Sequence, residues 1–174
     1  MNRICSWCKK VLEFEKNDQS APISHGICPE CYEMFDYKVS TLDEFLNSLQ
    51  MPVFLVDQNG VVESANSLAL DVIHKSIQSV QAQLGGNVLD CIYSALPGGC
   101  GQTIHCSGCV IRNSVQKTFS TGEPVIQAES FNYLKTSKGI VKMRVLISTE
   151  KIGKRILLQI HALTPMENAS DLKI

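Results

Sequence analysis

Eight cysteines among the 174 residues are the side chains whose type and spacing could do chemistry. They form two groups of four, which are Cys5, Cys8, Cys28 and Cys31 near the start and Cys91, Cys100, Cys106 and Cys109 in the middle. The spacings of the two groups differ, so they are not copies of one module. Cysteines clustered in a reducing compartment predict metal binding or redox chemistry rather than a disulfide framework.

The first group has the spacing of a structural zinc site. Two C-x2-C pairs, Cys5-Ser6-Trp7-Cys8 and Cys28-Pro29-Glu30-Cys31, are separated by 19 residues. Each C-x2-C turn brings two thiolates to one ion, and four thiolates complete a tetrahedron with no open position. A segment of about 36 residues is too short to sustain a core, so we expect zinc to supply its folding free energy. His25 is a substitute ligand, although four cysteines suffice.

The second group lies in an irregular segment, Asp90 to Cys109, that also contains four glycines. Glycine allows the tight turns that bring backbone amides to sulfur. Cys106 and Cys109 lie where a helix is expected to begin, and its exposed amides would stabilise thiolates. We expect these four cysteines to bind one centre together, with His105 beside the ligands or at the surface. Four thiolates suit zinc and iron–sulfur clusters alike, so zinc, an iron–sulfur cluster and thiol redox chemistry stay open.

Composition indicates a globular protein and argues against several function classes. Hydrophobic residues make up 44% and charged residues 19%, which argues against a disordered chain. The formal net charge of −1 lacks the basic excess of a general nucleic-acid binder. The first five residues have no apolar core of a secretory signal, and no run of about 18 apolar residues follows. We therefore expect a cytoplasmic protein with no membrane and no nucleic-acid partner.

Hydrophobic periodicity predicts the elements that precede the central cysteines. Leu42, Phe45, Leu46 and Leu49 recur at the spacing of an amphipathic helix, and Thr41-x-x-Glu44 has capping-box form. Residues 53–65 carry two short apolar runs around the turn signal Gln58-Asn59-Gly60, which predicts a β-hairpin. A helical pattern begins at Asn66.

The elements after the central cysteines are a helix and a sheet. Residues 110–119 are helical in pattern and end before Thr121-Gly122. Three β-like segments, 125–134, 140–148 and 155–163, are separated by short polar turns and predict an antiparallel meander. Because the helices are segregated from an antiparallel sheet, the predicted fold class is α+β.

Residues 3–36 resemble a zinc-ribbon-like module of bacterial signalling proteins. The resemblance rests on Ile4-Cys5-Ser6-Trp7-Cys8-Lys9-Lys10 and on Ser24-His25-Gly26-Ile27-Cys28-Pro29-Glu30-Cys31-Tyr32. It implies a small N-terminal zinc-binding module of four cysteines.

Residues 40–164 resemble a PAS domain. The carrying features are the hairpin from Pro52, the helix start Asn66-Ser67-Leu68-Ala69, and the turn Thr121-Gly122-Glu123-Pro124 before three long strands. The resemblance implies a five-stranded antiparallel sheet with helices on one face, enclosing a pocket for a ligand or cofactor. Residues 90–109 depart from the family pattern and look like the cysteine-rich insertion of a subset of bacterial PAS proteins. A four-cysteine iron–sulfur PAS sensor offers a mechanism by analogy, although its spacing differs.

These resemblances give an expected organisation and function. We expect a four-Cys module over 1–36, a connecting amphipathic helix over 37–51, a PAS-like sensor domain over 52–164 with the insertion 90–109, and a flexible tail over 165–174. Such a chain has no catalytic output domain, so we expect a non-enzymatic sensor that signals by association, as a homodimer and with a partner such as a kinase or regulator. The alternatives are an iron–sulfur or thiol redox sensor centred on the second cysteine group, and a structural zinc-binding adaptor.

Overall fold

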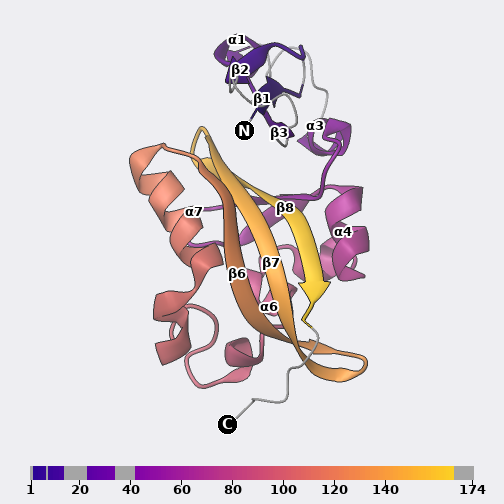
Figure 1. Cartoon of the computed structure of the whole chain (residues 1–174), viewed down its shortest axis with the longest axis vertical. Coiled ribbons are helices and arrows are strands. Elements are labelled where there is room, and N and C mark those ends of the chain that lie inside the picture. The colour runs from indigo at the N-terminus through magenta and orange to yellow at the C-terminus, as the bar shows by residue number, and fades with distance from the viewer. Residues whose placement is uncertain (1, 7, 14–22, 34–41, 167–174) are drawn as a thin grey trace. The chain divides into compact units, whose positions relative to one another are not determined.

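The computed structural model describes residues 2–6, 8–13, 23–33 and 42–166, and Figure 1 draws the whole chain. The chain divides into two compact units, Met1–Gln50 and Met51–Ile174. The Thr41 end of the predicted capping box lies outside the described residues, as does the predicted tail beyond residue 166. None of the described helices combines the length and apolar character that spanning a bilayer requires.

The first unit contains a small sheet that the sequence patterns did not predict. Its strands are β1 (Asn2–Cys5), β2 (Val11–Glu13) and β3 (Ile23–Gly26), in the order β2-β1-β3. β1 pairs antiparallel with β2 and parallel with β3. Strands this short carry too few residues for an alternating pattern to stand out in sequence.

Two short helices follow in the first unit. They are α1 (Pro29–Glu33), which begins next to Cys28, and α3 (Leu42–Ser48). The amphipathic helix is confirmed over the described residues, because Phe45, Leu46 and the following Leu49 are all buried. Leu42, at the start of the predicted apolar face, is 37% exposed.

The second unit is built on a five-stranded antiparallel sheet. Its strands are β4 (Val53–Val56), β5 (Val62–Ala65), β6 (Val125–Thr136), β7 (Gly139–Ile152) and β8 (Arg155–Pro165). Their order is β5-β4-β8-β7-β6, so the last strand pairs with the first hairpin, and Figure 1 shows the three long strands side by side. The predicted hairpin and meander are both confirmed, with the meander strands longer than expected.

Helical segments lie between the hairpin and the meander. They are α4 (Ser67–Ile73), α5 (Ile77–Val80), α6 (Gly85–Val88), the 3-10 turns η1 (Ile92–Ala95) and η2 (Ile104–Gly108), and α7 (Val110–Thr121). One hydrophobic core joins Ala69, Val80, Val88 and Val115 of the helices to the sheet residues. The sheet contributes Phe54, Val56, Val145, Ile147, Ile156, Leu158 and Ile160. The fold is therefore α+β and PAS-like, with helices packed on one face of the sheet.

Asn66 connects the hairpin to α4. It is fully buried, and its Oδ1 accepts hydrogen bonds from the amides of Val53 and Ala69, each at 3.0 Å. Its Nδ2 donates to the carbonyl of Met51 at 2.8 Å. One side chain thus caps α4 and also provides a hydrogen-bond acceptor for the Val53 amide at the start of β4. Without that acceptor, the buried amide would destabilise the fold.

Candidate metal centre and sensor cavity

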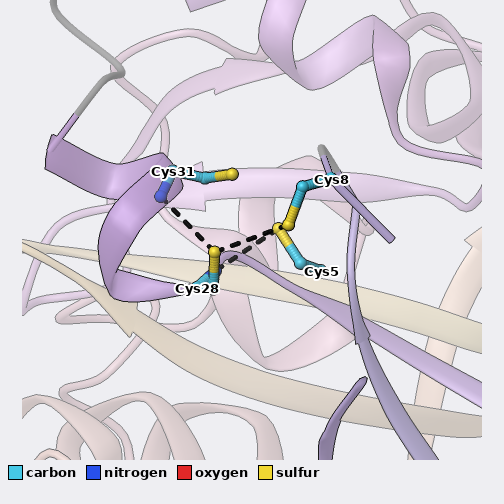
Figure 2. A group of neighbouring side chains, drawn as sticks. All are labelled: Cys5, Cys8, Cys28 and Cys31. Carbon is cyan, nitrogen blue, oxygen red and sulfur yellow. Dashed lines mark hydrogen bonds between the residues drawn. The ribbon is translucent and has the colours of Figure 1, made fainter. Parts of the chain in front are cut away.

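The sulfurs of Cys5, Cys8, Cys28 and Cys31 all lie within 4.8 Å of one another. Figure 2 shows the four side chains directed toward one another, with Cys5 at the end of β1, Cys8 shortly after it, Cys28 just before α1 and Cys31 within α1. Neither pair is joined by a disulfide. The Sγ atoms of Cys8 and Cys28 are 3.6 Å apart. A tetrahedron with zinc–sulfur bonds of about 2.3 Å would separate its sulfurs by about 3.8 Å, so this donor set fits a four-thiolate metal site.

Backbone amides and one ion pair hold the two cysteine pairs in place. The amides of Cys28 and Cys31 donate to the sulfurs of Cys5 and Cys28, both at 3.4 Å (Figure 2). Lys10, just after the first pair, forms an ion pair of 2.7 Å with Glu30 of the second. The hydrogen bond from Lys10 lowers the pKa of Glu30 to about 2. Amide donors of this kind support charge on the sulfurs.

Burial affects the ionisation of the first cysteine group. Cys5, Cys28 and Cys31 are buried, with Cys8 exposed. Burial raises the pKa of the Cys28 thiol and raises that of Cys31 to about 12. Burial favours the neutral form of the Cys28 and Cys31 thiols, whereas a metal binds thiolates, so metal binding here would release protons. His25, the substitute ligand, lies on β3 opposite Ile4 and is not one of the four clustered groups.

The four central cysteines are less closely gathered. Throughout residues 42–166 no three metal-ligating side-chain atoms lie within 4.8 Å of one another, so the shared centre stays a prediction. The backbone of Cys91 forms an isolated antiparallel β-bridge with Leu134 of β6, and its amide donates to the carbonyl of Gly86 at 2.8 Å. Cys100 also contacts α6, because a Cβ built on Gly86 would lie 2.6 Å from its Sγ. Cys109 is the residue that precedes α7, as the sequence predicted for the helix start.

Cys106 has the most polar surroundings of the four. Its Sγ accepts from the Gly101 amide at 3.1 Å and lies 3.2 Å from Oγ1 of Thr103. Burial by itself would raise the pKa of Cys106, but the hydrogen bonds from Thr103 and Gly101, together with the charge of Arg112, lower it below its ordinary value. For Cys91 and Cys100, burial dominates and raises the pKa of each thiol. His105 stacks on the Tyr93 ring, with centroids 3.9 Å apart.

The second unit encloses a cavity of about 290 Å³ between the sheet and the helices. Cys91, Cys100 and Cys109 line it, so three of the four central thiols share one wall. Most of the remaining wall is apolar and comes from strands and helices of the core, with Arg112 as its one permanently charged residue. The pocket that the PAS resemblance implied is therefore present.

Sequence reasoning missed the polar lining of this cavity. Arg112 and Gln116 are one turn apart on α7, and Asn132 faces inward from β6 beside Leu134. A signal was present for Asn132, because it occupies an inward position of a strand that alternates inward and outward. For Arg112 the signal was its place one turn after Cys109, directly after the apolar Val110 and Ile111 that begin a helix.

No protein-family model matches the sequence, and no curated protein matches it as a relative. Solved structures with a similar fold include the PAS domain of nitrogen regulation protein NR(II) from Vibrio parahaemolyticus, at 11% identity and a TM-score of 0.45, covering 71% of this chain and 98% of that one. A domain of a sensory box sensor histidine kinase/response regulator from Geobacter sulfurreducens has 17% identity and a TM-score of 0.45, covering 68% and 89%.

A LOV protein from Rhodobacter sphaeroides has 12% identity and a TM-score of 0.48, covering 74% of this chain and 66% of that chain. Identities this low concern the fold alone. The assignment of the second unit to the PAS-like class rests on its own strand order and on the helices that share its core.

Proposed function

We propose that this chain is a non-enzymatic sensory protein in which the PAS-like unit detects a signal and passes it on by protein association. The observation that carries the proposal is the cavity of about 290 Å³ inside a PAS-like fold, with three cysteines in its wall. A cavity of this kind, with few convergent polar groups, is the usual form of a small-molecule site. Eight thiols without disulfides are in keeping with a reducing, cytoplasmic location.

The N-terminal four-Cys site is proposed to bind one structural zinc ion. Four thiolates leave no open position for a substrate, so the ion would act by folding the first unit rather than by catalysis. Support comes from the sulfur separation of 3.6 Å and from the two amides that donate to sulfur. On this proposal, removing the ion leaves buried thiols without their common partner, and the small β1-β2-β3 sheet loses its support.

A second candidate function is a redox or oxygen sensor centred on Cys91, Cys100, Cys106 and Cys109. The favouring observation is that Cys106 accepts a hydrogen bond from the Gly101 amide and forms another with Oγ1 of Thr103, while the other three thiols line the cavity. A thiol whose surroundings lower its pKa is the kind that reacts with oxidants or binds metal. An iron–sulfur cluster at this centre would supply one-electron transfer, and without a cluster the thiols themselves would be the redox groups; a zinc ion, which has no redox chemistry, would make the centre structural.

One experiment separates these proposals. The full chain is purified without oxygen, its metals are counted, and its absorption spectrum is recorded before and after exposure to air. Two zinc ions with no visible band support zinc at both sites, whereas one zinc and an air-sensitive visible band support an iron–sulfur centre. Cys28→Ala should remove the first metal only, and Cys106→Ala the second only. One equivalent of metal that Cys106→Ala leaves unchanged rejects a metal role for the central cysteines and favours thiol redox chemistry.

Association is the proposed output, as a homodimer and with a partner such as a kinase or regulator. The resemblance to PAS proteins, which commonly pair, supports it. Phe45, Leu46 and Leu49 are buried in the single chain, so they are poor probes of a dimer contact. Sedimentation of the wild-type chain at tens of micromolar tests the homodimer, and a monomer at that concentration rejects it. If metals are present but neither cavity ligand nor association is found, a structural zinc-binding adaptor becomes the better description.

A further inference from the structure

The cavity of the second unit has a lining that selects for one kind of ligand. Residues Phe54, Val56, Val62, Leu158 and Ile160 make one side of it apolar. Its volume of about 290 Å³ lies just below the usual range for ligand pockets, which is about 300 to 1,000 Å³. The space therefore suits a small molecule with an apolar body better than a large cofactor.

Arg112 supplies positive charge to this apolar space. It lines the cavity and is only partly exposed. A Cβ on Gly101 would lie 3.4 Å from its Nε, so the glycine leaves room for the guanidinium beside the cysteine loop. Among the ion pairs of the described residues none involves Arg112, although exposed basic residues such as Arg144 and Arg155 do have carboxylate partners. A half-buried guanidinium without a carboxylate favours an anion from outside the chain.

Asn59, Gln102, Gln116 and Asn132 line the same cavity with side-chain amides, the last two from α7 and β6. Gln116 follows Arg112 by one helical turn, which places both on the same face of α7. Asn132 uses its Oδ1 to accept a hydrogen bond of 2.6 Å from Ser130, so its NH₂ group remains as a donor. Together the guanidinium and the amides of Gln116 and Asn132 offer N–H donors, and a carboxylate offers only acceptors.

From this arrangement we infer that the cavity binds a small organic carboxylate, with its carboxylate on Arg112, Gln116 and Asn132 and its hydrocarbon part against the apolar wall. The inference deepens the proposed sensory function and rests on it, because it names the ligand class of the cavity. The positive charge of Arg112 also acts to lower the pKa of the nearby Cys100 and Cys106 thiols. Stabilising these sulfurs would compete with binding a carboxylate, and titration of Arg112 variants distinguishes the two roles.

The test uses the full ¹⁵N-labelled chain in reducing buffer and follows its amide resonances during titration with three probes. Hexanoate has both parts of the expected ligand, hexanamide replaces the carboxylate by a neutral amide, and acetate lacks the hydrocarbon part. We expect hexanoate to shift the amides of Gly85, Gly86 and Gly101 saturably. Hexanamide and acetate should each bind at least about 10-fold more weakly, since charge-assisted hydrogen bonds and apolar burial each contribute that much.

Variants assign the charge to Arg112. Arg112→Met should weaken hexanoate binding by at least about 10-fold and leave hexanamide unchanged, whereas Lys117→Met, an exposed charge on the same helix, should change neither. If Arg112→Met does not fold, Arg112→Lys must still bind hexanoate better than hexanamide.

Equal binding of hexanoate and hexanamide overturns the inference. So does unchanged hexanoate binding by Arg112→Met, or the absence of shifts with any probe at 10 mM, a concentration about 10-fold above a 1 mM dissociation constant. Metal content and sedimentation would be unaffected by these failures, so the proposed function is judged separately.

Discussion

Gly86→Ala tests the contact between α6 and the cysteine loop. The added Cβ would lie 2.6 Å from Sγ of Cys100, 3.1 Å from its Cβ and 3.4 Å from the Cβ of Ser94. The sulfur at 2.6 Å must move to make room for the new methyl group, and the Cβ contact at 3.1 Å is tight as well, so the overpacking should cost about 1 to 3 kcal/mol. The neighbouring Gly85 is the matched control, because nothing lies within 4 Å of a Cβ built there. Neither glycine has a positive φ, so alanine is compatible with the backbone at both positions.

The two variants should therefore move stability in opposite directions. Gly85→Ala is expected to be neutral or to stabilise by up to about 1 kcal/mol, since alanine favours helix over glycine. Gly86→Ala should be about 1 to 3 kcal/mol less stable than Gly85→Ala, because both gain the same helix propensity and only one gains the clash. Amide hydrogen exchange of β4 and β8 in the full chain reports the second unit without interference from the first.

A second mutation identifies the sulfur as the cause. In a Cys100→Ala background the contact at 2.6 Å is gone, although the Cβ contact at 3.1 Å remains. Most of the cost of Gly86→Ala should then disappear, with a coupling of at least about 1 kcal/mol between the two positions. The reasoning would be refuted if Gly86→Ala cost the same in both backgrounds, or if it were as stable as Gly85→Ala.

Three further perturbations have defined outcomes. Asn66→Ala removes three hydrogen bonds of a buried side chain, one of which caps α4, so it should lower the free energy of unfolding by about 2 to 4 kcal/mol in the same exchange measurement; a loss below about 1 kcal/mol would contradict this. Burial lowers the pKa of His161, whose Nε2 lies 2.7 Å from Oγ of Ser148. The stability that neutral His161 contributes is fully present above about pH 6.5 and is lost as the pH falls through the lowered pKa of the folded protein. The free energy of unfolding, measured by chemical denaturation, should therefore depend less on pH in His161→Gln than in the wild type. Identical pH dependence in the two proteins would exclude His161 as the cause of the loss. Cys28→Ala should abolish tight zinc binding at the first site, and a metal count equal to the wild type would reject that site.

Local features of the fold were predictable because their causes are close together in sequence. Gln58-Asn59-Gly60 was expected to turn the chain, and Oδ1 of Asp57 accepts hydrogen bonds from the amides of Asn59 and Val61 there. The helix start at Asn66 depends on a cap that acts three residues away. The first cysteine group was predictable for a similar reason, since each C-x2-C turn brings two sulfurs together by itself.

The β1-β2-β3 sheet and the cavity were not predictable in this way. β1 pairs parallel with β3 over a long sequence separation, through strands too short to carry a pattern. The cavity wall combines β4, β5 and β8 with α6 and α7, so its lining depends on the insertion of β8 between β4 and β7. Arg112 on α7 and Asn132 on β6 therefore line a cavity whose remaining wall neither of these two elements determines by itself.

The sequence by itself determined which residues could do chemistry, the α+β class and the order of the main elements, because side-chain spacing, caps and turns act over a few residues. Only the tertiary structure decided which of those residues meet. It gathered Cys5, Cys8, Cys28 and Cys31 within 4.8 Å, and placed Cys91, Cys100 and Cys109 in the lining of a cavity. It also put Gly86 against Cys100 and Gly101 against Arg112. The physical reason is that such contacts depend on the packing of segments distant in sequence, where shape and volume, rather than local pattern, select the neighbours.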